Sequence, residues 1–231
     1  LMVPYLEAEM DHVTRMGEKF TTRTSGIGDV KLSSLIKLQE WHGGQLNFNA
    51  GISIPTGSID EKDDTPAGSN QHLPYPMQLG SGTYDLMPGL TYLGNNDTLS
   101  WGVQGVGTVR IGDNDNEYSL GDRFNLTTWI VKDWTSQFSS SLRVNGEWWS
   151  NIDGSDRKLS PMAPNMVPTA DPDKRAGRRF DLLVGASFSP ASGWFEGQRI
   201  AAEFGAPVYQ NLDGPQLETD WTVTLGWQLA L

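Results

Sequence analysis

The feature that most constrains the fold is a two-residue alternation of apolar and polar side chains that recurs along the chain. In residues 28–39, for example, Val30 and Leu32 fall on one face and Lys31 on the other. Successive side chains of a β-strand point to opposite faces, so this period predicts strands rather than helices. The ten expected strands cover about residues 1–10, 28–39, 45–54, 80–92, 99–111, 123–130, 138–148, 179–188, 199–205 and 220–231.

The connections between these strands alternate in length. Short ones fall at residues 40–44, 94–97, 133–136 and 190–197, and long or polar ones at 11–25, 55–78, 112–119, 151–177 and 207–218. Short turns at one end and long loops at the other are typical of outer-membrane β-barrels. We therefore expect an all-β fold, a single antiparallel up-and-down transmembrane β-barrel domain over residues 1–231, in a bacterial outer membrane.

A soluble sandwich or lipocalin-like barrel would alternate in the same way. Two features favour the membrane. The expected strands are about ten residues long, whereas strands of globular proteins average about five or six. Tryptophans also lie near strand ends on the apolar face, as in the aromatic girdles of membrane barrels; these are Trp101, Trp148, Trp221 and Trp227.

Composition excludes several classes of function. The chain has 17 Lys and Arg against 28 Asp and Glu, a formal charge of −11, so it lacks the basic surface that nucleic-acid binding requires. It has no cysteine, which rules out disulfides, a thiolate nucleophile and a zinc–thiolate site. No run of about 18 apolar residues predicts a transmembrane helix. The chain opens at Leu1 without an initiator Met, and we interpret it as a mature or trimmed product.

The polar face of the expected barrel should line the lumen. Its acidic and basic residues nearly balance, which predicts ion pairs between neighbouring strands that stiffen or plug a narrow pore. The expected lumen-lining residues are Lys31, Lys37, Asp85, Arg110, Arg123, Arg143, Glu147, Arg179, Asp181, Arg199 and Glu203.

The acidic surplus falls mainly in the loops. Asp60, Glu61, Asp63 and Asp64 are expected to form an acidic rim at one mouth of the pore. Such a rim raises the local concentration of cations, and salt screens its effect. The sequence therefore predicts a mild cation preference.

One loop has the composition of a calcium site. Within residues 112–122, Asp113, Asp115, Glu117 and Asp122 offer the hard oxygen ligands that suit Ca²⁺. Their spacing is not that of an EF-hand, and a polar outer loop with Asx turns would have the same residues. No other cofactor is expected.

The positions of the three histidines in the sequence argue against a catalytic site. His12, His42 and His72 are all expected in exposed loops or turns, which supports neither a Ser–His–Asp triad nor a histidine metal site. We therefore expect no enzymatic activity.

Three stretches carry a resemblance to a known family. They are Gly80–Tyr92 (GSGTYDLMPGLTY), Ser25–Leu32 (SGIGDVKL) and Pro55–Gly57 (PTG). The chain from about Ser25 to its C-terminus resembles the outer-membrane transporter-like family named for the MetA pathway of phenol degradation. The resemblance implies a Gram-negative outer-membrane barrel with a transport role and no catalytic residues. It also implies an additional N-terminal portion, enough for twelve strands in the full-length protein.

Three classes of function remain open. A porin-like channel or transporter for small polar or aromatic solutes ranks first. A structural or partner-binding barrel within a larger assembly ranks second, and a soluble ligand-binding barrel or a barrel enzyme ranks last. The expected partners are outer-membrane lipid, a small solute, and an oligomer or assembly partner, without nucleic acid.

Overall fold

The main body of the protein is one antiparallel β-sheet whose strands pair in up-and-down order. The structure, a computed structural model, describes residues 1–160, 163–190 and 196–229. The sheet contains the ten strands β3 (Val30–Trp41), β4 (Gly44–Ile54), β7 (Tyr84–Leu86), β8 (Gly89–Asn95), β9 (Leu99–Ile111), β11 (Arg123–Asp133), β12 (Phe138–Trp149), β14 (Gly177–Phe188), β15 (Gln198–Leu212) and β16 (Thr222–Leu229). The expected all-β antiparallel fold is confirmed.

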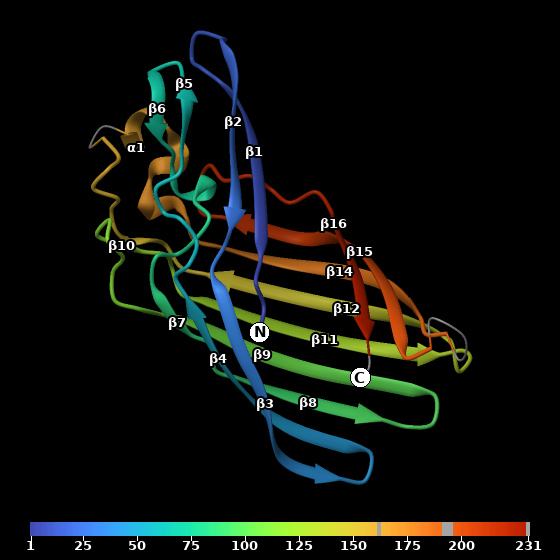
Figure 1. The fold of residues 1–231 in the computed structure, drawn as a ribbon. Coiled ribbons are helices and arrows are strands. Elements are labelled where there is room, and N and C mark those ends of the chain that lie inside the picture. The colour runs from blue at the N-terminus through green and yellow to red at the C-terminus, as the bar shows by residue number, and fades with distance from the viewer. Residues whose placement is uncertain (161–162, 191–195, 230–231) are drawn as a thin grey trace.

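The other elements gather at one end of this sheet, and short turns join the strands at the opposite end (Figure 1). They are β1 (Tyr5–Val13), β2 (Lys19–Ile27), β5 (Lys62–Thr65), β6 (Gly68–His72), η1 (Tyr75–Met77), β10 (Tyr118–Ser119), β13 (Asp153–Gly154), α1 (Ala163–Met166), η2 (Pro168–Ala170) and η3 (Pro172–Lys174). None of the described helices is long and apolar enough to cross a membrane.

The membership of the sheet differs from the expected strands in two places. The first expected strand, residues 1–10, is β1, and it pairs with β2 in a separate hairpin. β2 falls in a segment expected to be a loop, because it has polar side chains on both faces and gives no alternation. The expected strand at residues 80–92 is divided into β7 and β8 around Pro88, which has no N–H to donate. Within the described residues, β3 and β16 are the two edges and do not pair with each other.

The strands bury polar side chains and expose apolar ones. In β8, Thr91 is 3% exposed while the preceding Leu90 is 52% exposed. We call the face with Thr91, Thr127 and Asp181 the inner face, and the face with Leu90, Leu142 and Val184 the outer face. The inner residues named are all buried and the outer ones all exposed. This is the reverse of a soluble sheet, in which the apolar face is the buried one.

Aromatic rings lie near both ends of the strands on the outer face. Phe124, Trp148, Phe180 and Tyr209 form a row across four strands, with successive ring centroids 5.8, 5.1 and 6.0 Å apart. Near the short turns, Trp41 stacks on Tyr92, with ring centroids 5.8 Å apart. The expected positions Trp101 and Trp227 also lie in the parts of β9 and β16 nearest the short turns. Two aromatic belts therefore flank the exposed apolar face.

Candidate functional site

A folded cap covers one end of the sheet. We define the cap as residues 55–82, 112–122, 150–160 and 163–176, which come from three separate connections between strands. The cap has the apolar core that the sheet lacks. One cluster contains Tyr75, Tyr118 and Ile152, and a second contains Leu73, Met77 and Met10 of β1. Burial raises the pKa of the Tyr75 and Tyr118 hydroxyls.

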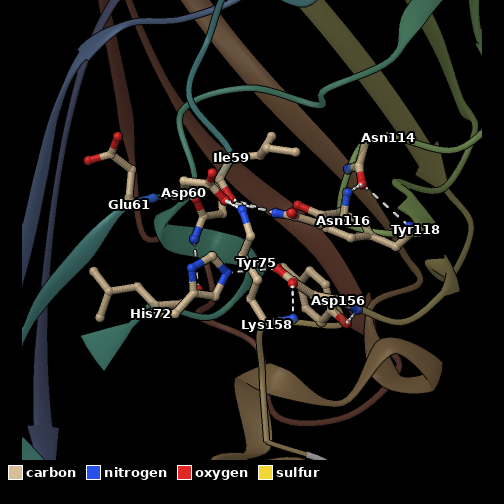
Figure 2. Close-up of polar contacts among 12 residues, drawn as sticks. Ile59, Asp60, Glu61, His72, Tyr75, Asn114, Asn116, Tyr118, Asp156 and Lys158 are labelled. Atoms are coloured by element: carbon tan, nitrogen blue, oxygen red, sulfur yellow. Dashed lines mark hydrogen bonds and ion pairs between the residues drawn. The ribbon is translucent and has the colours of Figure 1, made fainter. Parts of the chain in front are cut away.

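Polar side chains join the three connections within the cap (Figure 2). His72 Nε2 lies 2.8 Å from Asp156 Oδ2, and both side chains are buried. The backbone N–H of Asp156 donates to the Tyr75 hydroxyl at 3.1 Å. Asn116 Nδ2 donates to Asp60 Oδ1 at 3.0 Å, and Lys158 forms an ion pair with the same carboxylate. The cap is therefore a cross-linked unit rather than a set of independent loops.

Asp29, at the start of the main sheet, anchors the cap to the strands. Its Oδ1 accepts a hydrogen bond from the Gly57 N–H at 3.0 Å, and its Oδ2 accepts from the Ser81 N–H at 2.7 Å. Gly80 packs so closely here that an added Cβ would lie 2.6 Å from Asp29 Oδ1. The three stretches that carried the family resemblance therefore meet at one point of the structure, which we call the Asp29 junction.

The inner face has ion pairs between neighbouring strands, as the sequence predicted, and also pairs of other kinds. Asp85 of β7 pairs with Arg110 of β9. Glu147 of β12 lies 3.4 Å from Arg123 of β11 and 3.5 Å from Arg179 of β14. Arg143 of β12 reaches across β14 to Glu203 of β15 at 3.0 Å, and Arg179 lies 3.0 Å from Asp181 on its own strand.

The remaining expected lumen residues behave differently. Arg199 donates to Ser187 Oγ at 3.0 Å. Lys37 pairs with Glu40 on the exposed surface, and the backbone of Lys31 bridges to Met2. The assignment of the whole set to an aqueous lumen stays a prediction.

A cavity of about 340 Å³ lies between the cap and the ends of β11, β12 and β14 that are nearest to it. Three arginines and one glutamate line it, together with aromatic and aliphatic side chains. We call it the arginine cavity; its charged residues are Arg123, Arg175, Arg179 and Glu147. Sequence reasoning missed Arg175 because it lies in a loop, outside the alternating strands.

The acidic rim residues take part in the structure of the cap. Asp60 accepts from Asn116 and pairs with Lys158, which lowers the pKa of Asp60. Asp63 accepts from the Arg23 N–H at 2.8 Å and from the Asp64 N–H, which lowers the pKa of Asp63. Asp64 accepts from the Asn70 N–H at 2.9 Å. Their role in ion selectivity stays a prediction.

The expected calcium ligands do not converge. Glu117 pairs with Arg157 at 3.2 Å, and Asp122 accepts from the Arg110 N–H at 2.9 Å. Among the described residues, no group of three or more His, Asp and Glu side chains could hold a metal ion. The geometry therefore gives the loop that contains Asp113 and Asp115 no support as a calcium site.

The expectation of exposed histidines is wrong for His72, and His12 is not in a loop. His72 is buried against Asp156, and His12 lies in β1, where its Nε2 is 2.9 Å from Thr22 Oγ1. His42 lies exposed in the β3–β4 turn, as expected. The local sequence around His72 gave no sign of burial, because its partner is 84 residues away.

Comparisons with known proteins identify the fold. No protein-family model and no curated protein sequence matches the chain. The chain is similar to the crystal structure of the COG4313 outer membrane channel from Pseudomonas putida F1, with a TM-score of 0.61 and 12% sequence identity. The match covers 95% of this chain and 79% of that chain. The match shows that this chain shares the fold of that protein. The MetA-pathway name stays a prediction.

Proposed function

We propose that this chain forms the wall of an outer-membrane channel that passes small solutes along its inner face. The observation that carries the proposal is the reversal of the two faces: large apolar side chains cover the outside and polar ones are buried. Lipid is the solvent that such an outer face requires, and a polar interior is typical of outer-membrane barrels.

The spacing of the aromatic belts supports the same conclusion. In β12 the belts are represented by Phe138 and Trp148, ten residues apart. Ten residues of strand extend about 33 Å. A tilt of about 40° reduces this length to about 25 Å, the height of the apolar band of outer-membrane barrels.

The cap limits the size of the solute. It occupies the end of the sheet that bears the long connections (Figure 1), and the arginine cavity lies directly beneath it. A solute that enters from this end has to pass the cap, so the proposed channel is narrow and selects for small molecules.

The proposed channel prefers cations mildly. Asp60 and Asp63 have lowered pKa values, so both carry a fixed negative charge at neutral pH. Together with Glu61 and Asp64 they place negative charge at the capped mouth. Screening acts over about 10 Å at 0.1 M salt, so this rim acts on entering ions and its effect declines as salt rises.

Planar-bilayer recording of the purified protein tests the proposal. We expect small ion-conducting steps and, in a low-salt gradient, a reversal potential on the cation-selective side. An anion-selective potential would mean that the arginines of the inner face determine selectivity. Reproducible insertion without conductance would contradict the channel and favour the structural or partner-binding barrel.

A further inference from the structure

We propose that the arginine cavity binds the carboxylate of a small organic anion, whose apolar body lies against Tyr75 and Trp149. The proposal assigns a ligand class to the cavity and rests on the proposed channel for the route by which the ligand reaches it. The mild cation preference concerns small ions at the acidic rim, whereas the arginines beneath the cap act on the ligand that reaches the cavity. The cavity volume, about 340 Å³, is within the range of pockets that enclose small ligands.

Arg175 supplies the first argument. Its backbone N–H donates to Asn151 Oδ1 at 2.7 Å, and its carbonyl accepts from Trp149 Nε1 at 2.7 Å. The backbone is therefore held firmly at the cavity wall. Its guanidinium has no hydrogen-bond or ion-pair partner among the described residues, and its Nη1 is buried. Arg175 as a whole is half-buried, so the cost falls on this one donor: a buried polar atom of a cation without a partner is unfavourable, and a bound anion would satisfy it.

Arg123 and Arg179 supply the second argument. Both contact Glu147, at 3.4 and 3.5 Å, which are long distances for charge-assisted hydrogen bonds. Arg179 also pairs with Asp181, which lies just outside the lining, at 3.0 Å. Three guanidinium groups at the cavity therefore face two carboxylates, and the surplus of one positive charge falls on Arg175. Arginine is the side chain best suited to a carboxylate, because its planar fork can donate two parallel hydrogen bonds.

The uncharged part of the lining determines what the rest of the ligand looks like. Tyr75 and Trp149 contribute aromatic side chains to the lining, and Leu120 and Ile152 contribute aliphatic ones. The polar side chains of Gln78, Ser150 and Gln216 complete it. An inorganic anion would leave this apolar surface unused. An anion with a compact apolar body would bury it, which is favourable by about 25 cal/mol per Å² of apolar area.

Equilibrium binding in detergent tests the site without requiring conductance. The probes are cyclohexanecarboxylate and its neutral analogue cyclohexanecarboxamide, titrated calorimetrically into the full chain. We expect saturable binding of the carboxylate and at least about tenfold weaker binding of the amide, since hydrogen bonds to a charged group contribute about 1.5–3 kcal/mol.

Two variants in the cavity should act in opposite directions. Arg175→Gln removes the unpaired guanidinium and should weaken binding of the carboxylate about tenfold or more. Glu147→Gln removes the competing carboxylate and should strengthen binding about two- to fivefold. The matched control is Arg199→Gln. Arg199 also lacks a carboxylate partner in the described structure, but it lies near the short turns and lines a different cavity.

The outcomes separate the site from the channel. Equal loss of binding in Arg175→Gln and Arg199→Gln, equal affinity for carboxylate and amide, or no saturable binding would each overturn the site. If Arg175→Gln does not fold, the sign of the Glu147→Gln effect decides: weaker binding would overturn the site. Conductance without binding would reject the site and keep the channel. Binding without conductance would keep the site and reject the channel.

Discussion

The ten-stranded sheet, which we call the wall, and the cap bury opposite kinds of side chain. In the wall, Asn49 and Thr91 are buried and hydrogen-bonded to each other, while Leu142 and Val184 are exposed. In the cap, Leu73, Met77 and Tyr118 are buried. Both regions belong to one chain, and the strands of the wall lead directly into the cap. The difference is what the proposed function requires of one chain that meets two solvents, with lipid around the wall and water around the cap.

The two regions are stabilised by different interactions. Backbone hydrogen bonds run along the whole wall, and polar side chains bridge its strands, as where Gln104 donates to Thr91 at 2.8 Å. The cap has few strand pairings and depends on its two small apolar clusters and on contacts such as that of His72 with Asp156. A region with so small a core needs attachment to a larger one, and the Asp29 junction provides it.

The largest effect should come from placing a charge on the outer face. Leu142→Arg puts a guanidinium at the middle of the exposed apolar band, where it should cost about 2–4 kcal/mol of unfolding free energy in a lipid bilayer. The matched control is Ser141→Arg, one residue earlier and on the inner face, which should cost less than about 1 kcal/mol. Denaturant titration from phospholipid bilayers measures both. Equal costs would mean that the wall does not have one lipid-facing side.

A smaller effect should separate the cap from the wall. Gly80→Ala brings a methyl group against the Gly57 carbonyl and the Asp29 carboxylate. We expect a cost of about 1–3 kcal/mol, the usual range for overpacking, and it should fall mainly on the cap. Hydrogen exchange should therefore accelerate in residues 55–82 and stay slow in β11 and β12.

Gly226→Ala is the control for that change, because an added Cβ there meets nothing within 4 Å. It should leave the hydrogen-exchange rates of residues 55–82 and of β11 and β12 unchanged. If exchange in Gly80→Ala became faster throughout the wall, the result would contradict the view that the Asp29 junction stabilises mainly the cap.

Acid should loosen the cap before the wall. The pKa values of Asp60 and Asp63 are lowered by their partners in the folded cap. A group with a lowered folded-state pKa stabilises the fold above its unfolded pKa, about 3.9 for Asp, and this contribution is lost as pH falls through the folded value. Because Asp60 is exposed and Asp63 is only partly buried, the effect should be small.

Hydrogen exchange of the cap, corrected for the intrinsic pH dependence of exchange, measures this effect between about pH 5 and pH 3. In the double variant Asp60→Asn, Asp63→Asn, hydrogen exchange of the cap should already be faster at about pH 5 and should change less as the pH falls. The same pH response in the variant and in the natural sequence would show that other groups are responsible.

The smallest effect concerns charge at the capped mouth. Asp60, Asp63 and Asp64 also hold the cap together, so neutralising all four rim residues mixes charge with structure. Glu61 is the clean position, because its carboxylate makes no hydrogen bond or ion pair with the described residues. Glu61→Gln should shift the reversal potential slightly towards anions at low salt. The shift should vanish near 1 M salt, where screening acts over about 3 Å; a shift that persists there would contradict a rim effect.

The wall could be predicted from the sequence because side-chain direction in a strand is set locally. Once Lys31 and Leu32 are known to lie in a strand, they must point to opposite faces. Up-and-down order makes consecutive strands neighbours, which is why the sequence predicted ion pairs between neighbouring strands. It did not predict the individual partners, and Arg143 and Glu203 pair across an intervening strand. The hairpin of β1 and β2 escaped prediction, since Thr22 and Thr24 are buried polar residues on a strand whose other face is also polar.

The cap could not be predicted because its contacts join distant parts of the chain. Nothing near His72 indicates that Asp156 will lie beside it, and nothing near Arg175 indicates a cavity. The glycines of the three stretches that resemble the family could be identified from the sequence, but their structural role could not. Only the folded chain shows that Gly57 and Gly80 are small because the Asp29 carboxylate and two backbones meet there.

The long-range contacts of the cap also set the order in which the protein can assemble. Asp60 and Lys158 are 98 residues apart, and His72 and Asp156 are 84 apart. Closing a loop of about 90 residues costs about 4 kcal/mol of chain entropy beyond the constant for a short loop. The paired strands already bring these segments together, so the cap should form last. An incomplete wall would then display its connections as open, protease-sensitive chain, and a closed cap would mark a finished molecule.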